Sequence, residues 1–414
     1  MNHCLRRWLR ISIFNLLLVA LAGVLMRYKI AYSLPFINQQ YFLHAHSHFA
    51  FAGWVTQALM SLMVFFLYEA GNIVAFRRYK WILYANLFAA YGMLLTFPFF
   101  GYASLSIVFS TLSIVVSYCF AVQFWKDLNL LPQNRAVHGW FKAAVLFNVL
   151  SSLGAFSLAF MLATKTIQTE RYLASVYFFL HFQYNGWFFF ACMGLFAHQL
   201  YRYRAPEIKL RRAFILFAAS CVPAFFLSAL WMPIPKWLYG MVILAVILQL
   251  AGWVLIWQLV KGCWTEMRRG MAKLPQYLFL LCALALTIKL SLQSASVIPS
   301  LSKLAFGFRP IVIGYLHLVL LGVITLFILS YCIGFRLVPV NKATAGGVIV
   351  FTAGIIVNEI LLMMQGVQDL NYQSVPYINE MLFAAALIML AGIGMINYGQ
   401  RFTGHDRHKI RENN

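Results

Sequence analysis

The sequence predicts an all-α polytopic membrane protein with twelve transmembrane helices in three pseudo-symmetric arcs of four. Of its 414 residues, 63% are hydrophobic and 10% are charged, which excludes an ordinary soluble domain. Long apolar runs of about 18 to 30 residues recur along the whole chain, and each is long enough to cross a bilayer as a helix. A motif of histidine and glycine also recurs three times, at nearly constant spacing. A fixed period of this kind predicts an internally repeated architecture.

The apolar runs predict the helices in chain order. Their approximate ranges are 11–27, 39–68, 81–101, 103–125, 140–163, 172–201, 212–231, 236–260, 275–297, 309–335, 346–366 and 376–398. They fall into three groups of four, at about 1–138, 139–272 and 273–414. We therefore expect a single integral membrane domain over residues 1–414, built from three units.

The distribution of basic residues predicts the orientation in the membrane. The net charge of +22 would suit a nucleic-acid-binding protein, but 24 of the 32 lysines and arginines fall at span ends or tails on the side of the N-terminus. This is the positive-inside bias. We therefore expect a multi-pass protein of the bacterial inner membrane with both termini cytoplasmic, in contact with lipid and not with nucleic acid. The seven cysteines form no C-x-x-C pair, so neither a disulfide framework nor a zinc site is indicated.

The repeated motif places a histidine inside the second span of each unit. It runs from His48 to Gly53, from His181 to Gly186 and from His317 to Gly322. Each histidine lies eight or nine residues into its span, which puts all three about 12–14 Å below the same membrane surface. Histidine is costly inside a bilayer and is usually functional there. We therefore expect the three imidazoles to meet around a haem or a metal ion.

The first unit carries two further histidines, His44 and His46. At 100° per residue, His44 and His48 face the same way while His46 points nearly opposite. This pattern assigns His48 to the central site, His46 to another neighbour, and His44 to a second ligand or a hydrogen bond with a propionate. Gly53 and Gly322 would let a helix face lie against a flat macrocycle. The alternative is that these glycines serve helix packing and that each histidine is a hydrogen-bonded structural residue.

The surrounding residues favour a haem over a hydrolytic zinc site. A haem needs two axial nitrogens and apolar walls, and the motifs lie in aromatic, apolar sequence. No carboxylate stands beside the motifs to act as a base, which disfavours a zinc hydrolase. Lys289 and Glu359 fall at similar depth in the last unit, where we expect either an ion pair or a polar route to the histidines.

This pattern resembles subunit I of the haem–copper oxidase superfamily, which includes the cytochrome oxidases and nitric oxide reductases. The resemblance implies that His48 or His46 is one axial ligand of a low-spin haem and His317 the other. It further implies that His181, with Tyr184 nearby, belongs to a copper or non-haem iron site. The chain departs from the family in having no histidine in its seventh span, and in having Tyr315 where the family has a ligand of a second haem. The segment His44-Ala45-His46 is also similar to the opening of NnrS, a haem and copper membrane protein associated with the nitric oxide response.

We therefore expect a respiratory-type membrane haem protein, b-type, with copper or non-haem iron as a second metal. Its expected function is electron transfer, or the binding or reduction of NO or O₂ by an oxidoreductase that does not pump protons, with an electron donor or partner subunit that the sequence does not identify. The candidate residues are Tyr184 and Tyr315 for catalysis, His44, His46, His48, His317, Gly53 and Gly322 for the cofactor, and His181, His48 and His317 for a metal. The alternative is a histidine-lined transporter for a metal ion or a small anion.

Overall fold

The computed structural model describes residues 3–132, 134–302, 308–371 and 373–401, and every regular element in these ranges is a helix. The first predicted unit contains α1 (His3–Tyr32), α2 (Gln39–Phe49), η1 (Ala50–Thr56), α3 (Gln57–Glu69), α4 (Ala75–Phe100) and α5 (Ser104–Leu130). The second contains α6 (Arg135–Ala163), α7 (Thr169–His181), η2 (Phe182–Phe188), α8 (Phe189–Arg202), α9 (Glu207–Cys221), η3 (Pro223–Ala229) and α10 (Lys236–Gly270). The third contains α11 (Lys273–Ala295), α13 (Arg309–His317), η4 (Leu318–Thr325), α14 (Leu326–Gly334), α15 (Lys342–Leu370) and α16 (Ile378–Arg401).

The helices fit a polytopic membrane protein. Within the described residues, ten are long and apolar enough to cross a membrane, or eleven if the pair α9 and η3, bent by 44°, forms one span. The predicted count of twelve is not confirmed. The predicted seventh span is the bent pair, and Pro223 stands at its break because proline cannot continue the hydrogen-bond ladder of a helix. The predicted sixth span corresponds to α7, η2 and α8, whose middle carries His181, Gln183 and Asn185 and so lowers its hydropathy.

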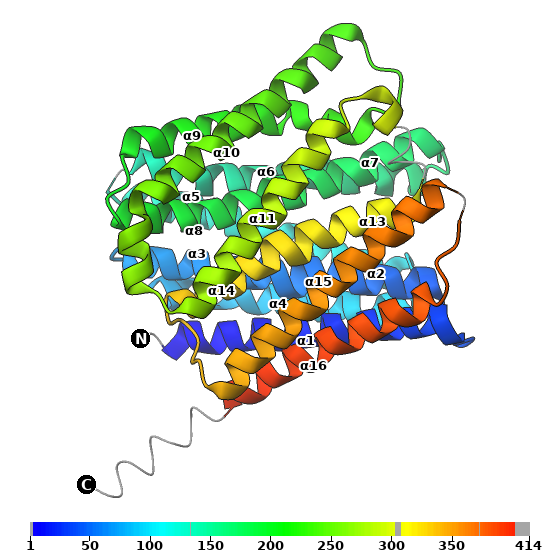
Figure 1. The fold of residues 1–414 in the computed structure, drawn as a ribbon, viewed down its shortest axis with the longest axis horizontal. Coiled ribbons are helices and arrows are strands. Elements are labelled where there is room, and N and C mark those ends of the chain that lie inside the picture. The colour runs from blue at the N-terminus through cyan, green and yellow to red at the C-terminus, as the bar shows by residue number, and fades with distance from the viewer. Residues whose placement is uncertain (1–2, 133, 303–307, 372, 402–414) are drawn as a thin grey trace, which may run out of the picture.

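The helices lie side by side in one bundle, which α10, α11 and α15 cross obliquely (Figure 1). The helix α1 begins and α16 ends at the same side of this bundle, which we call the terminal side (Figure 1). The opposite side, where α2 and α13 begin, is the distal side. Pairs of helices far apart in sequence pack together, as α1 does with α16.

The terminal half of the bundle contains the densest core. In α14 all nine residues are buried, and in α3 eleven of thirteen are buried. The distal segments of the same two central helices differ. In α13 none of the nine residues is buried, and in α2 only Ala45 and Phe49 are. The central helices therefore retain accessible surface in the distal half alone.

A π-helical segment separates these two halves in each central helix. The segments η1, η2 and η4 begin one or two residues after His48, His181 and His317, respectively. A π-helical turn leaves carbonyl groups without their usual partners, and such turns are rare and often mark functional sites. The recurrence at one place in three helices is what three equivalent units would produce.

Side chains from neighbouring helices satisfy carbonyl groups of the π-helical segments. The Nδ2 of Asn15 donates to the Gly53 carbonyl over 2.6 Å. The thiol of Cys282 donates to the Val323 carbonyl over 3.2 Å, and that of Cys221 lies 3.9 Å from the Asn185 carbonyl. Buried backbone groups in a bilayer require such partners, so these contacts let the irregular turns persist there.

Two tryptophan side chains link the central helices to one another just beyond the π-helical turns. Trp187 Nε1 donates to Thr56 Oγ1 over 3.2 Å, and Trp54 Nε1 donates to Thr325 Oγ1 over 3.0 Å. Each tryptophan stands six residues after its histidine, and each threonine eight. A tryptophan–threonine hydrogen bond between equivalent positions thus joins the second unit to the first, and another joins the first unit to the third.

Candidate functional site

His46 of α2 and His317 of α13 form the one histidine pair that joins two units at the predicted depth in the distal half. The two imidazoles are close enough to interact electrostatically. His46 lies against α1, where a Cβ added at Gly23 would stand 3.5 Å from its Cε1. Both residues are partly exposed. The pair therefore involves α1, α2 and α13.

The ring nitrogens of this pair differ in what they bond. His317 Nδ1 donates to the Ile313 carbonyl of its own helix over 2.8 Å, which fixes the tautomer and leaves Nε2 as the unprotonated nitrogen. His46 Nδ1 is buried without a hydrogen-bond partner among the described residues. Arg27, near the distal end of α1, interacts electrostatically with both rings. The site therefore offers two ring nitrogens, His317 Nε2 and His46 Nδ1, that could bind a metal, and the guanidinium group of Arg27 lies near them.

His48 has different neighbours from this pair, so the structure does not bring it together with His317. Its ring stacks on Phe97 of α4 at a centroid distance of 4.7 Å and an angle of 6°. Its Nε2 lies 3.2 Å from the hydroxyl of Tyr102, against which the ring of His44 also packs. The predicted rotation of 100° per residue holds, but packing turns His46 rather than His48 toward α13.

His181 is a fully hydrogen-bonded core residue. Its Nε2 donates to the Cys221 carbonyl over 2.8 Å, and its Nδ1 lies 3.1 Å from Asn185 Nδ2. Its side chain is completely buried. With both nitrogens engaged, the ring has no lone pair to offer a metal, which corrects its assignment as a ligand.

The three repeated histidines consequently do not converge. Across the part of the chain that the structure describes, no three or more His, Cys, Asp or Glu side chains are grouped so that they could hold a metal ion. The donor set His181, His48 and His317 does not fit a copper or non-haem iron ion, because each ring has different neighbours. A haem, which needs only two axial nitrogens, remains compatible with the pair His46 and His317.

The two predicted cofactor glycines have close neighbours of different kinds. A Cβ on Gly322 would approach Ala285 Cβ of α11 to 3.1 Å, which agrees with the alternative that small residues let membrane helices approach. A Cβ on Gly53 would approach the ring of Phe49, in the preceding turn of the same central helix, to 2.6 Å.

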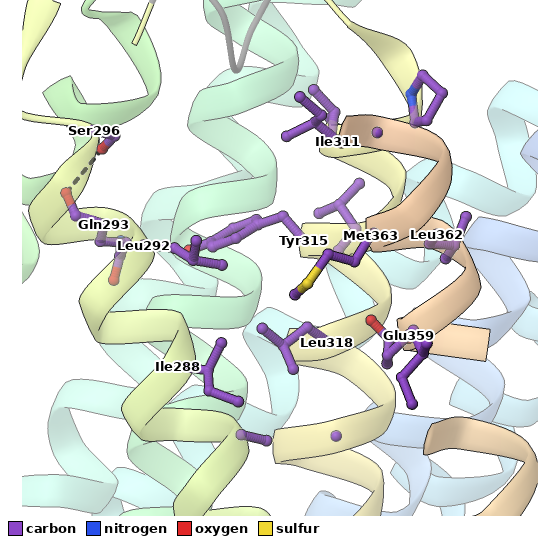
Figure 2. A pocket seen from close by; sticks show the side chains of 18 of the residues that line it. Ile288, Leu292, Gln293, Ser296, Ile311, Tyr315, Leu318, Glu359, Leu362 and Met363 are labelled. Atoms are coloured by element: carbon purple, nitrogen blue, oxygen red, sulfur yellow. Dashed lines mark hydrogen bonds between the residues drawn. The ribbon is translucent and has the colours of Figure 1, made fainter. Parts of the chain in front are cut away.

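Tyr184 and Tyr315, the predicted catalytic residues, are brought together. Their ring centroids lie 6.3 Å apart in an edge-to-face arrangement. Both line a cavity between α11, α13 and α15 (Figure 2). Tyr315 thus lies on the cavity side of α13, two residues before His317.

Lys289 and Glu359 do not form the expected ion pair. Lys289 is buried and interacts electrostatically with His181 and Cys221. The carboxylate of Glu359 instead accepts a hydrogen bond from Asn358 over 3.1 Å and lines the cavity. Of the two side chains, only Lys289 lies near one of the repeated histidines, so a polar route that uses both stays a prediction.

The structure adds residues that sequence reasoning missed. Tyr102 and Phe97 enclose His48, while Arg27 approaches the histidine pair. Asn185 could have been identified from the sequence, because it stands one helical turn after His181. Gly101 could also have been identified, because glycine is common in turns. In the structure its φ of 55° and ψ of −138° form the turn before Tyr102.

Comparison with known proteins gives no further identification: no family model matches the chain, and no match to a curated protein is found. The candidate site therefore depends on its own geometry.

Proposed function

We propose that this protein is a membrane haem protein that holds a b-type haem between His46 and His317 for electron transfer. The observation that carries this proposal is that these two histidines, from two different units, lie near enough for the charge of one to act on the other, in the half of the bundle where α2 and α13 are largely unburied. A haem bound there would supply a one-electron redox centre in an apolar environment.

The residues present fit such a group. His317 already donates from Nδ1 to a backbone carbonyl, which orients the ring and leaves Nε2 free for iron. His46 Nδ1 is buried without a partner among the described residues, so this ring has a nitrogen to spare. Arg27 would neutralise a propionate, since its charge already acts on both rings. Both α2 and α13 are largely unburied around the pair, so a haem bound there would cover surface that the protein leaves accessible.

The same proposal extends to the membrane arrangement. Adding the bent pair α9–η3 and the helix α7–η2–α8 to the ten apolar helices gives twelve spans, or four in each unit. An even number puts both termini on one side, in agreement with the shared side of α1 and α16 (Figure 1). The excess of basic residues on that side favours the cytoplasm of a bacterial inner membrane.

Electron transfer is favoured over oxygen or nitric oxide reduction at a binuclear centre. His181 is saturated by hydrogen bonds, and His48 stacks on Phe97, so neither supplies a second metal site beside the haem pair. Binding of a diatomic gas would require one axial histidine to leave the iron. The kinship with haem–copper oxidase subunit I stays part of this proposal.

The deciding experiment is the reduced-minus-oxidised absorption spectrum of the purified protein and four variants. We expect a Soret band and a sharp reduced α-band, both lost in His46→Ala and in His317→Ala. His48→Ala and His181→Ala should keep them. Imidazole added to His317→Ala should restore the α-band, because it supplies the missing ligand without repairing anything else.

The controls separate loss of ligand from loss of fold. His198→Ala, in the terminal half against Phe66, should leave the spectrum unchanged. Each variant is checked for a monodisperse elution profile. Loss of the bands in His48→Ala but not in His46→Ala would reject this pair. A colourless wild-type protein would reject the haem and favour the histidine-lined transporter.

A further inference from the structure

A cavity of about 620 Å³ lies between the third unit and residues of the second, among them Tyr184 and Ser228. Its walls come chiefly from α11, α13 and α15, and Tyr315 of α13 and Leu318 of η4 lie between Gln293 on one wall and Glu359 on the other (Figure 2). Its size is in the range of pockets that hold small organic ligands. The proposed haem pair does not line it.

The cavity opens toward the lipid. Exposed apolar residues of α11 and α15 form its rim, namely Leu284, Leu292, Ile356, Ile360 and Met363. Such residues face acyl chains in a membrane-spanning bundle, so a ligand would enter sideways from the bilayer. It must therefore be soluble in the membrane.

Polar groups inside the cavity call for a ligand that donates hydrogen bonds. Gln293 is buried, with 8% of its surface exposed, and its Oε1 has no hydrogen-bond partner among the described residues. The carboxyl group of Glu359 accepts a hydrogen bond from the Asn358 amide at Oε1, which leaves its other oxygen available to a ligand. Buried oxygens of this kind are stabilised by a donor, and a plain acyl chain provides none.

The charges at the cavity select against an anionic ligand. No lysine or arginine is among the described residues that line it. Lys289 stands one turn before Gln293 on α11 but does not line the cavity. A phosphate or fatty-acid carboxylate would therefore meet Glu359 without a neutralising cation.

We propose that this cavity binds an uncharged membrane lipid that bears hydroxyl groups, which donate to Gln293 and Glu359 while its apolar part fills the space against α13. A lipid alcohol and a lipid hydroquinone share this chemistry. The inference is independent of the haem, since it concerns a different set of residues.

The test measures binding of four ten-carbon probes to the full-length protein in detergent by native mass spectrometry. The probes are decyl-hydroquinone, 1-decanol, decanoate and decylamine. We expect the two hydroxyl-bearing probes to bind at least about tenfold more tightly than decanoate, whose carboxylate would face Glu359, and more tightly than decylamine, whose charge would have to leave water for apolar walls. Preference for the hydroquinone over decanol would identify an aromatic diol as the ligand, and equal binding would identify a lipid alcohol.

Two variants locate the site. Gln293→Leu should weaken the hydroxyl-bearing probes by about five- to twentyfold, because it removes one acceptor with little change in volume. Ile360→Trp should weaken all probes by filling the rim. Gln249→Leu, at a buried glutamine of α10 outside the cavity, should change nothing. Equal affinity for all four probes, tighter binding of a charged one, or equal effects of Gln293→Leu and Gln249→Leu would overturn the proposal.

Discussion

The two ends of a single central helix differ strongly in how many of their residues are buried. α13 and α14 have nine residues each, and both are largely apolar, yet no residue of α13 is buried and every residue of α14 is. The helix α2 differs from α3 in the same direction. A central position in the bundle therefore does not by itself bury a side chain. What differs is the neighbours, which close around the terminal half and leave space in the distal half.

The largest expected effect tests this difference with one substitution on each side. Ile328→Ala, at a residue of α14 that is 1% exposed, should lower the free energy of unfolding by about 2–5 kcal/mol, because a dense core cannot close the resulting hole. Ile313→Ala in α13 should cost less than about 1 kcal/mol, since its surroundings are already incompletely packed. Unfolding in mixed detergent micelles measures both. Similar losses in the two variants would mean that the halves are equally packed.

A second prediction concerns the turn at Gly101, in the distal half, where the backbone conformation disfavours any residue other than glycine. Gly101→Ala should cost about 1–3 kcal/mol, because the backbone there has a conformation that side chains disfavour. The new Cβ would also stand 2.5 Å from the ring of Tyr41. Gly240→Ala is the matched control, since nothing lies within 4 Å of that position in α10. The control should be neutral or stabilising by up to about 1 kcal/mol; a larger loss in Gly240→Ala than in Gly101→Ala contradicts the prediction.

The smallest expected effect concerns the bond that joins two units. Trp187→Phe removes the hydrogen bond to Thr56, whose net contribution should be about 1 kcal/mol. A double-mutant cycle with Thr56→Val isolates that contribution from the change in ring volume. A coupling energy near zero would show that the two side chains touch without stabilising the interface.

Much of the fold could be predicted from hydropathy and period. The second predicted span, 39–68, is observed as Gln39–Glu69, and the tenth, 309–335, as Arg309–Gly334. The predicted span 236–260 is too short, because α10 continues to Gly270 through polar residues that hydropathy assigns to a loop. The bend at Pro223 was readable from proline chemistry, but its angle depends on how η3 packs.

The candidate site was less predictable, because it depends on rotation about helix axes. Sequence fixes the angle between His46 and His48, but the contacts of α2 with α1 and α4 decide which of them faces His317. The π-helical segments add a second difficulty. They change the number of residues per turn, so the direction of Trp54 cannot be extrapolated from His48 at 100° per residue. Trp54 bonds Thr325 instead of lining a cofactor.

The π-helical segments also allow the residues before them to change direction without changing how the residues after them pack. Deleting one residue from η4 would restore an ordinary α-helical turn and rotate everything before it by about 100° relative to α14. Leu316 would then face the surface that His317 serves, and Tyr315 would turn away from the cavity, while the tightly packed segment after them stayed in register. Evolution could thus redirect the functional side chains of this protein by single-residue insertion or deletion, leaving the core sequence untouched.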